Sequence, residues 1–440
     1  MENKEIQEII NLYNSKKLDL AEKEVVKLIK TEPNNSILFN IFGAILTGKK
    51  RFDQAIINYK KSIKINPNYA EAYNNLGIAL NETKKFDESI DSYKKAIQIK
   101  SDFAEAYNNL GVVFKKLEKF DQSINSYLKA IKIKSNYAEA YYNYGNVLGE
   151  INKIEEAISN YKKAIKLDAN FAKAYNNLGN LLKDITKTKE ACEFLDKLMI
   201  IKPSHIGYKI NRKLLIPPIC ESIQEIDRYR NEYEEGLKFL EKYKHFNENP
   251  SQSIGTHFFY LAYHNKDNLK IMKSTSNLFK KIIPNINYIS KNIKIQKKSK
   301  KIKIGFISEF LTNHTIGRIF EGLIKNLNRK KFEILVFHTA QTKKGLLKDE
   351  INNSVNKVVV LPNKIIDQHQ LIEKESLDIL FYTDIGMSPT TYFLAYSRLA
   401  PIQIVSWGHT ETTGIDTIDY FLSSTLFEAN IQKNNYSERL

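Results

Sequence analysis

The feature that most constrains this chain is a residue pattern that returns every 34 positions through its first half. The block AEAYNNLG at residues 70–77 recurs at 104–111, and it returns as AEAYYNYG and AKAYNNLG at the next two steps. A second block, F-D-x-[AS]-I-x-x-Y, follows in the same phase, as do Pro33, Pro67 and Pro203. A unit of this size cannot bury its apolar face alone, so neighbouring copies must stack into an array.

This pattern resembles the tetratricopeptide repeat over residues 2–205. The resemblance implies an α solenoid of antiparallel helix pairs, and we expect this domain to span residues 1–205. Gly77 and its equivalents would let the two helices of a pair approach closely. Tyr73, Leu76, Ile90 and Tyr93 fall at helical spacing and would fill the interface of the pair.

One column of asparagines stands in the same register of successive repeats. An amide carries both a donor and an acceptor, so it can pair with a peptide backbone without reading side chains. Solenoids of this kind use extended concave surfaces for binding, and we expect protein or peptide partners in that groove. The alternative is that the column reflects the abundance of asparagine in this chain. The column breaks at Ile41, and its members are Asn75, Asn109, Asn143 and Asn177.

The repeat is lost in residues 206–300, which we interpret as a helical connector. Residues 222–243 have the spacing of an amphipathic helix. The segment FFYLAYHNKDN, residues 258–268, follows a turn signal at Asn249 and Pro250. On these residues alone, His264 is predicted to pack at the end of a helix.

Residues 301–440 alternate short apolar runs with helical patterns, which predicts a parallel, doubly wound, Rossmann-like sheet. Ligands of such sheets bind beyond the carboxyl ends of the strands. The segments to inspect are therefore 309–317, 383–389 and 408–414. The predicted strands are 302–308, 332–338, 358–361, 378–382, 402–407 and 418–423, and the predicted helices are 316–327, 365–375 and 390–398.

Several segments of this region resemble one family. KIKIGFISEFLTNHTIG, residues 301–317, is similar to the opening strand and loop of the O-linked N-acetylglucosamine transferase and SPINDLY-type glycosyltransferases. LDILFYTDIGMSP, LAYSRLAPIQIVSWGHTETTGIDTIDYFLSS and the closing YSERL match the same family, and FFYLAYHNKDN resembles its linker. The family joins tetratricopeptide repeats to a GT-B catalytic unit of two Rossmann-like halves. The resemblance implies transfer of a sugar, N-acetylglucosamine, from a UDP donor to Ser or Thr of proteins, with inversion and with neither metal nor cofactor.

The resemblance also implies catalytic residues. His314 matches a histidine that faces the family's active site, Glu309 stands near the family's aspartate, and His264 matches the histidine of the linker motif. Neutral histidines and a carboxylate can relay a serine proton at pH 7. Two alternatives stay open: His314 could cap the following helix, and Glu309 is a glutamate placed one residue further from His314 than the family's acid.

The resemblance implies substrate-binding residues after the fifth predicted strand. Gly408 matches a glycine whose backbone lies against the transferred sugar, and His409 occupies an aromatic position of the family. Thr410 replaces a proline that is usual there, which leaves the identity of the sugar open.

Residues 301–440 have the size of one Rossmann-like half. In the family, the second half provides a lysine for the diphosphate, the uracil pocket and a helix N-terminus that faces the phosphates. The chain has neither a P-loop nor a G-x-G-x-x-G motif to replace them. We therefore expect this polypeptide by itself to be inactive, as a transferase whose other half is truncated, split onto a separate chain or lost by a frameshift. The alternative is a non-catalytic repeat adaptor that keeps a folded half-enzyme for its shape.

Composition excludes several other classes. The formal net charge is +17, but the densest run, residues 291–303, is typical of a solvated linker and no nucleic-acid motif accompanies it. Two cysteines, Cys192 and Cys220, cannot form a disulfide framework or a cysteine zinc site. The polar start MENKEIQEII and the lack of a long apolar run predict a cytoplasmic protein without a membrane span.

Overall fold

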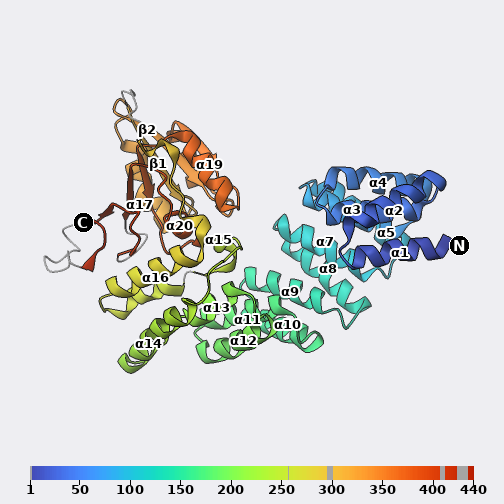
Figure 1. Ribbon diagram of the computed structural model, residues 1–440, viewed down its shortest axis with the longest axis horizontal. Helices are drawn as coiled ribbons and strands as arrows, with labels where there is room; N and C mark the ends of the chain where they lie inside the picture. Colours follow the sequence, from blue (N-terminus) through green and yellow to red (C-terminus); the bar gives the residue numbers. More distant parts are fainter. Residues whose placement is uncertain (1, 256, 295–300, 407–411, 424–434) are drawn as a thin grey trace. The chain divides into compact units, whose positions relative to one another are not determined.

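The computed structural model describes residues 2–255, 257–294, 301–406, 412–423 and 435–440 (Figure 1). The chain forms two compact units, Met1–Leu181 and Leu182–Leu440. The predicted domain boundaries at residues 205 and 300 are drawn from motifs, whereas these two units are defined by how compactly the chain folds. The boundaries at 205 and 300 therefore stay a prediction. Within the described ranges, no helix is long and apolar enough to cross a lipid bilayer.

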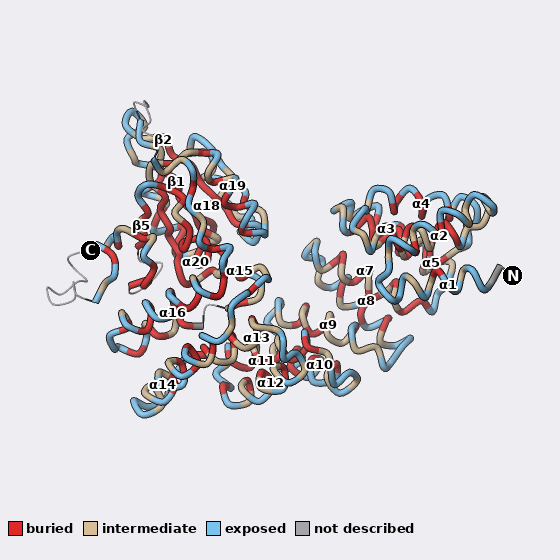
Figure 2. The backbone as a smooth tube through the Cα atoms, in the orientation of Figure 1, coloured by how far each residue is buried: buried red, intermediate tan, exposed pale blue. Residues whose placement is uncertain are grey.

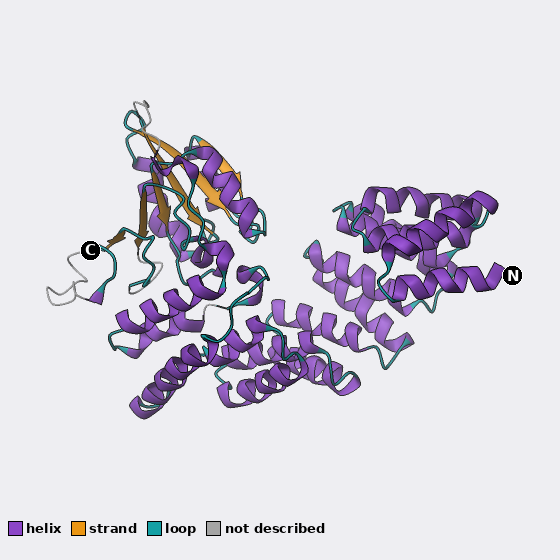
Figure 3. Ribbon diagram, viewed as in Figure 1, coloured by secondary structure: helices purple, strands orange, loops and turns teal. Residues whose placement is uncertain are grey.

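The first unit consists of helices of 13 or 14 residues that pack in antiparallel pairs (Figure 3). This agrees with the predicted α solenoid. Its helices are α1 (Glu2–Asn14), α2 (Leu18–Thr31), α3 (Ser36–Gly48), α4 (Phe52–Ile65), α5 (Ala70–Glu82), α6 (Phe86–Ile99), α7 (Ala104–Lys116), α8 (Phe120–Ile133), α9 (Ala138–Glu150) and α10 (Ile154–Leu167), and α11 (Ala172–Asp184) crosses the unit boundary.

A glycine and a tyrosine interlock in each of four successive pairs. A Cβ atom on Gly77 of α5 would lie 2.6 Å from Cε1 of Tyr93 of α6, and the same relation recurs at Gly43, Gly111 and Gly145. The Tyr93 side chain is buried. The prediction that these glycines let paired helices approach closely is confirmed. Leu76 and Ile90 are buried beside them, whereas Tyr73 is half-buried.

Much of the helical part of the second unit shares one core with its sheet. The predicted amphipathic helix is α14, which buries Tyr229, Tyr233, Leu237 and Leu240. These side chains belong to one core that extends to the sheet, and within it the rings of Phe258 and Tyr392 lie 4.4 Å apart. The helical segments that precede the sheet in this unit are α12 (Thr188–Ile201), α13 (Ile206–Lys213), α14 (Ile223–Leu240), α15 (Pro250–Ser253), η1 (His257–His264), α16 (Leu269–Ile282), η2 (Pro284–Ile286) and η3 (Lys291–Lys294).

The sheet has six parallel strands in the order β3-β2-β1-β4-β5-β6. This arrangement confirms the predicted Rossmann-like fold. In the central register, Ile307 of β1 pairs with Phe337 of β2 and with Tyr382 of β4. The strands are β1 (Ile302–Ser308), β2 (Phe332–His338), β3 (Lys357–Val360), β4 (Ile379–Tyr382), β5 (Ile402–Ser406) and β6 (Tyr420–Leu422).

Buried residues run along the strands (Figure 2), and their alternation gives each face of the sheet its own core. Phe306 and Phe381 point to the face covered by α17 (Thr315–Asn326) and α18 (Leu346–Ser354). Ile307 and Tyr382 point to the opposite face, with α19 (Ile365–Glu375), α20 (Pro389–Leu394) and the connector helices. Buried side chains on both faces explain why the strands are apolar runs.

Two helices differ from the prediction. Helix α18 has no counterpart among the predicted helices, and α20 ends at Leu394 rather than near Arg398. The early end has a tertiary cause. The N–H of Arg398 donates to the carbonyl of Tyr288, and the N–H of Ser290 donates back to the carbonyl of Arg398. These bonds join the end of this segment to the connector, so its backbone no longer pairs within a helix.

Candidate active site at the carboxyl edge of the sheet

The strand order creates a switch point between β1 and β4. The chain leaves β1 toward β2 on one side, whereas the strands that follow β4 continue to the other side. The loops after these two strands therefore diverge, and a crevice at their carboxyl ends is where doubly wound sheets bind ligands. Glu309 follows β1, and Asp384 lies two residues beyond β4.

Glu309 connects the two loops. Its Oε2 accepts a hydrogen bond from the Ser388 hydroxyl at 2.7 Å, and its main-chain N–H donates to Oδ2 of Asp384 at 3.2 Å. Ser388 is the N-cap of α20, and its Oγ also accepts from the N–H of Thr390. The glutamate side chain is half-buried. The predicted Glu309 thus stands at the switch point with a fixed side-chain partner.

Asp384 is the residue at this edge that sequence reasoning missed. Its side chain is fully buried, and Oδ1 has no partner in hydrogen-bonding geometry within the described residues. Burial raises the pKa of Asp384 to about 7, and the neighbouring Glu309 carboxylate adds to the rise, whereas the Glu309 N–H and the Ser308 and Thr391 hydroxyls oppose it. The sequence singled out residues 383–389 as a loop but gave no reason to select this aspartate.

Other buried polar atoms at the same edge have no hydrogen-bond partner among the residues that the structure describes. Thr312 Oγ1 lies in the loop after β1, His338 Nδ1 at the end of β2, and Thr383 Oγ1 directly after β4. Burial also lowers the pKa of His338. Buried polar atoms are nearly always paired, so a group of unpaired ones in the described residues marks a place suited to a polar ligand.

His314 is the N-cap of α17. Its Nδ1 accepts a hydrogen bond from the N–H of Ile316 at 3.2 Å, and its ring lies 4.6 Å from that of Phe310. The capping role that the sequence left open is therefore present. Because Nδ1 is the acceptor, the neutral ring carries its proton on Nε2, which can donate to an oxygen atom.

His264 lies at the end of η1, buried as the residues alone predict. Its Nε2 is 3.8 Å from the thiol of Cys220, and its Nδ1 has no hydrogen-bond partner among the described residues. Burial lowers its pKa, and the positive charges of Arg230 and Lys266 add to the effect. This contact lies within the connector, whereas Glu309 and His314 both belong to the segment that joins β1 to α17.

Gly408 and His409 lie outside the described residues. The chain that follows them is held by Glu438 of the closing YSERL segment. Glu438 accepts from the Thr412 hydroxyl at 2.7 Å and from the Thr413 N–H at 2.8 Å. The resemblance of YSERL to the family does not by itself predict this contact.

The asparagine column bridges successive repeats. The amide nitrogen of Asn109 donates to Oδ1 of Asn74 in the preceding repeat at 3.0 Å, and Asn75 and Asn143 make the same bond to Asn40 and Asn108. Each of these column amides is half-buried.

The fourth member of the column differs. Asn177 donates to Oδ1 of Asn146 at 2.8 Å and to the hydroxyl of Tyr142 at 3.2 Å. Tyr142 occupies the register position that an asparagine holds in the earlier repeats, which explains the change of partner. Each of the four column asparagines thus donates an amide N–H to a residue of the preceding repeat.

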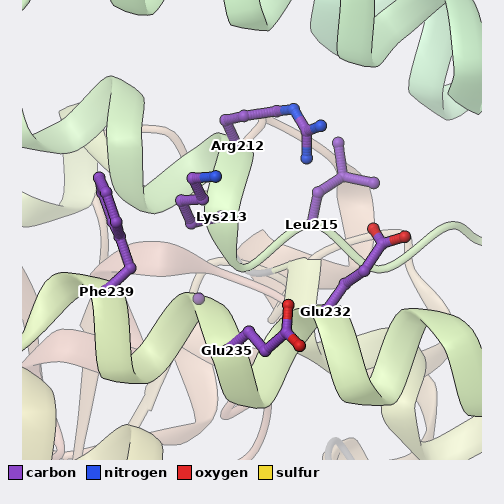
Figure 4. A pocket seen from close by; sticks show the side chains of 7 residues that line it. Arg212, Lys213, Leu215, Glu232, Glu235 and Phe239 are labelled. Atoms are coloured by element: carbon purple, nitrogen blue, oxygen red, sulfur yellow. The ribbon is translucent and has the colours of Figure 1, made fainter.

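Two pockets of the second unit contain none of the predicted site residues. One, of about 410 Å³, lies between the end of α13 and α14, where Arg212 and Lys213 face Glu232 and Glu235 (Figure 4). Arg212 is paired with Asp196 at 2.8 Å. The other pocket, of about 460 Å³, has Tyr288, His369 and Glu373 in its lining.

Comparison with known families identifies the α/β region. Residues 253–440 match the family described as glycosyl transferase family 41. This part of the chain is a family 41 domain. The repeats match as well: residues 43–83, 79–118, 114–152 and 145–185 match the TPR repeat, and residues 172–205 match the tetratricopeptide repeat. A comparison with curated proteins finds no match.

Solved structures resemble parts of the chain. A mutant of the Thermobaculum terrenum O-GlcNAc transferase is 17% identical, with 84% of this chain and 56% of that chain covered and a TM-score of 0.41. MamA is 29% identical over 37% of this chain and 94% of its own, with a TM-score of 0.34. YrrB, described as a TPR protein with an unusual peptide-binding site, is 24% identical over 41% and 94%, with a TM-score of 0.33. The chain carrying the family 41 domain thus spans 56% of the length of that transferase, and the assignment rests on the matched families.

Proposed function

We propose that this protein takes part in protein O-glycosylation, transferring N-acetylglucosamine from a UDP donor to Ser or Thr of proteins recruited by its repeats. The observation that carries the proposal is the carboxyl edge of the family 41 domain, where Glu309 and His314 follow β1 at the switch point of the sheet. This is the edge where doubly wound folds bind their ligands. The donor itself would be the only cosubstrate, without metal or cofactor.

In the proposed reaction, the acceptor hydroxyl attacks the anomeric carbon, UDP leaves, and the configuration inverts. Glu309 is suited to receive the hydroxyl proton because it is a half-exposed carboxylate held by Ser388. His314 is suited to donate from Nε2 to a substrate oxygen, since its Nδ1 accepts from Ile316. We propose that His264 acts nearby once substrate is bound, with Gly408 and His409 contacting the sugar.

The repeats would hold the acceptor in an extended form. Asn75, Asn109 and Asn143 each donate one N–H to the preceding repeat, so the carbonyl oxygen of each is the group available to pair with peptide N–H groups. The carbonyl oxygen of Asn177 also accepts from the amide of Asn176 at 3.4 Å. This supports recognition of backbone rather than of side chains. We therefore propose that acceptors bind along Asn75, Asn109, Asn143 and Asn177.

We further propose that residues 1–440 by themselves do not catalyse transfer and need a second Rossmann-like half, on a separate chain or elsewhere. The described residues contain one such sheet, whereas the resemblance implies a nucleotide bound between two. Isothermal titration with UDP tests this dependence. We expect a dissociation constant well above the micromolar range, and micromolar binding would contradict the proposal.

A cytoplasmic location fits this chemistry. Cys192 and Cys220 are free thiols in the described structure, as a reducing compartment favours. Fractionation of the native cell, with the protein detected by antibody, checks the location, and recovery outside the cytoplasm would exclude it.

Mass spectrometry of the native cell's proteins tests the function. The intact gene is compared with versions encoding Glu309→Gln, which keeps the size of the side chain while removing the acidic group, and His314→Ala, which removes the donor ring. We expect N-acetylhexosamine on Ser or Thr of repeat-bound proteins to fall at least about tenfold in both variants. Unchanged modification in both would sink the proposal.

The second candidate is a non-catalytic adaptor, favoured by the hydrogen bonds that already link the asparagine column from repeat to repeat. Pull-down of partner proteins by the full chain separates the two classes. An adaptor loses its cellular effect when Asn109→Ala and Asn143→Ala abolish capture, yet keeps it in Glu309→Gln. A transferase loses its effect in Glu309→Gln while capture persists.

A further inference from the structure

Two loops at the switch point are tied by a crossed pair of hydrogen bonds. From the loop after β4, the Asp384 carboxylate accepts from the main-chain N–H of Glu309 at 3.2 Å. From the loop after β1, the Glu309 carboxylate accepts from the hydroxyl of Ser388 at 2.7 Å. Each loop thus supplies one carboxylate and one donor. We call this pair of bonds the crossed latch.

The latch begins where the parallel ladder between β1 and β4 ends. The N–H of Thr383 still donates to the carbonyl of Ile307. One step further along the chain, the main-chain N–H of Glu309 donates to Oδ2 of Asp384 rather than to a main-chain carbonyl. The two strands part at this point, and a side chain keeps their loops together.

A tight turn in the loop after β4 brings Asp384 and Ser388 to the same side, toward the end of β1. The N–H of Met387 donates to the carbonyl of Asp384 at 3.1 Å, and Gly386 between them has φ of 94°. A positive φ at this position of a turn favours glycine. The turn reverses the chain so that Asp384 at its start and Ser388 just after it both face Glu309.

The position of Glu309 is transmitted to His314 through a short, packed loop. His314 caps α17, and the carbonyl of Thr312 lies only 2.1 Å from where a Cβ of Gly317 would stand. The loop therefore lies directly on the first turn of α17. A shift of Glu309 would change both the carboxylate and the capping histidine of the proposed site.

The surroundings of Asp384 make this latch sensitive to protonation. Glu309, from the end of β1, is the ionisable group that acts on it among the described residues, and Ser308 and Thr391 contribute hydroxyls from β1 and α20. The residue is fully buried, and its Oδ1 has no partner in the described structure. A buried carboxylate with one unpaired oxygen is poorly solvated, so the neutral form competes with the ion.

We propose that Asp384 is a positioning residue for the family 41 site, which holds the β1–α17 loop in place and thereby sets where Glu309 and His314 stand. The purpose assigned to this loop rests on the proposed function. The latch itself is a property of the fold and can be measured without turnover.

Hydrogen exchange with mass spectrometry on the full chain tests the proposal, using Asp384→Asn, Asp384→Leu and Ser388→Ala. Asn keeps an acceptor for the Glu309 N–H, whereas Leu removes it at similar size. After correction for intrinsic rates, we expect exchange in residues 309–317 to rise about tenfold in Asp384→Leu, with the solenoid unchanged. In Asp384→Asn, we expect residues 309–317 to stay as protected from exchange as in the parent protein. We also expect that this variant loses the change in exchange between about pH 6 and about pH 8 that the parent protein shows.

Unchanged exchange of residues 309–317 in Asp384→Leu would overturn the proposal, as would a pH difference that persists in Asp384→Asn. If the Leu variant does not fold, Ser388→Ala decides, because it removes the hydroxyl that donates to Glu309, the other half of the latch. Exchange unchanged in that variant would likewise overturn the proposal. A failure of glycosyl transfer with the expected exchange pattern would reject the proposed function and leave the latch standing.

Discussion

The ring of Tyr93 occupies the space that a side chain on Gly77 would need. A Cβ atom at Gly77 would stand 2.6 Å from Cε1 and 2.8 Å from Cδ1 of that ring. The ring is buried between the two helices of the repeat and cannot move aside without disturbing its neighbours. The repeat thus depends on glycine for packing volume rather than for backbone freedom.

Gly77→Ala should therefore destabilise the solenoid by about 1–3 kcal/mol through overpacking. Urea unfolding followed by circular dichroism measures the change. Gly149→Ala in α9 is the matched control, since a Cβ there meets no atom within 4 Å. We expect the control to be neutral or to gain up to about 1 kcal/mol from helix propensity. Equal losses in both variants would contradict the steric explanation.

Asn109→Ala should weaken the contact between two successive repeats. It removes the bond to Asn74, and we expect a loss of about 0.5–1.5 kcal/mol in the free energy of unfolding. Asn125→Ala, on the exposed side of α8, is the control and should change stability by less than about 0.5 kcal/mol. A loss as small as the control's would show that the column contributes nothing to the solenoid itself.

Asp384→Asn should stabilise the second unit at alkaline pH. The pKa of the folded protein's Asp384, about 7, lies above the usual 3.8, so between these values the folded state binds more protons and stability falls as pH rises. The loss approaches about 4 kcal/mol above pH 7. Thermal unfolding at several pH values should show a flatter profile in the variant. A parallel profile would mean that Asp384 does not titrate with folding.

His369 should make the folding stability change with pH in the opposite direction to Asp384. Burial lowers its pKa from 6.5 to about 4, its Nε2 lies 2.8 Å from the Ser397 hydroxyl, and its ring stacks on Tyr288 at 4.6 Å. Below pH 6.5 the unfolded state binds more protons, so stability falls by about 3 kcal/mol as pH drops toward 4. His369→Gln should remove this acid loss in calorimetry, and an unaltered acid limb would contradict the assignment.

Much of the candidate site was predictable because it follows from local order. Glu309 and His314 lie directly after a strand that alternation and apolar content predict, and loops after parallel strands are where ligands bind. The helix-capping alternative for His314 was also predictable, since the residue precedes an amphipathic run. Asp384 was not, because its importance comes from burial and from a contact with a residue 75 positions away.

The amino-acid sequence by itself determined the repeat, the alternation of strands and helices, and the family 41 motifs. These are periodic or contiguous patterns that can be read along the chain without knowing which distant residues meet. Tertiary structure alone decided that Asp384 meets Glu309, that Asn109 donates to Asn74, and that the connector shares its core with the sheet. Such contacts depend on strand order and on the stacking of distant helices, so no local pattern records them, and they decide which polar groups are buried and which can act.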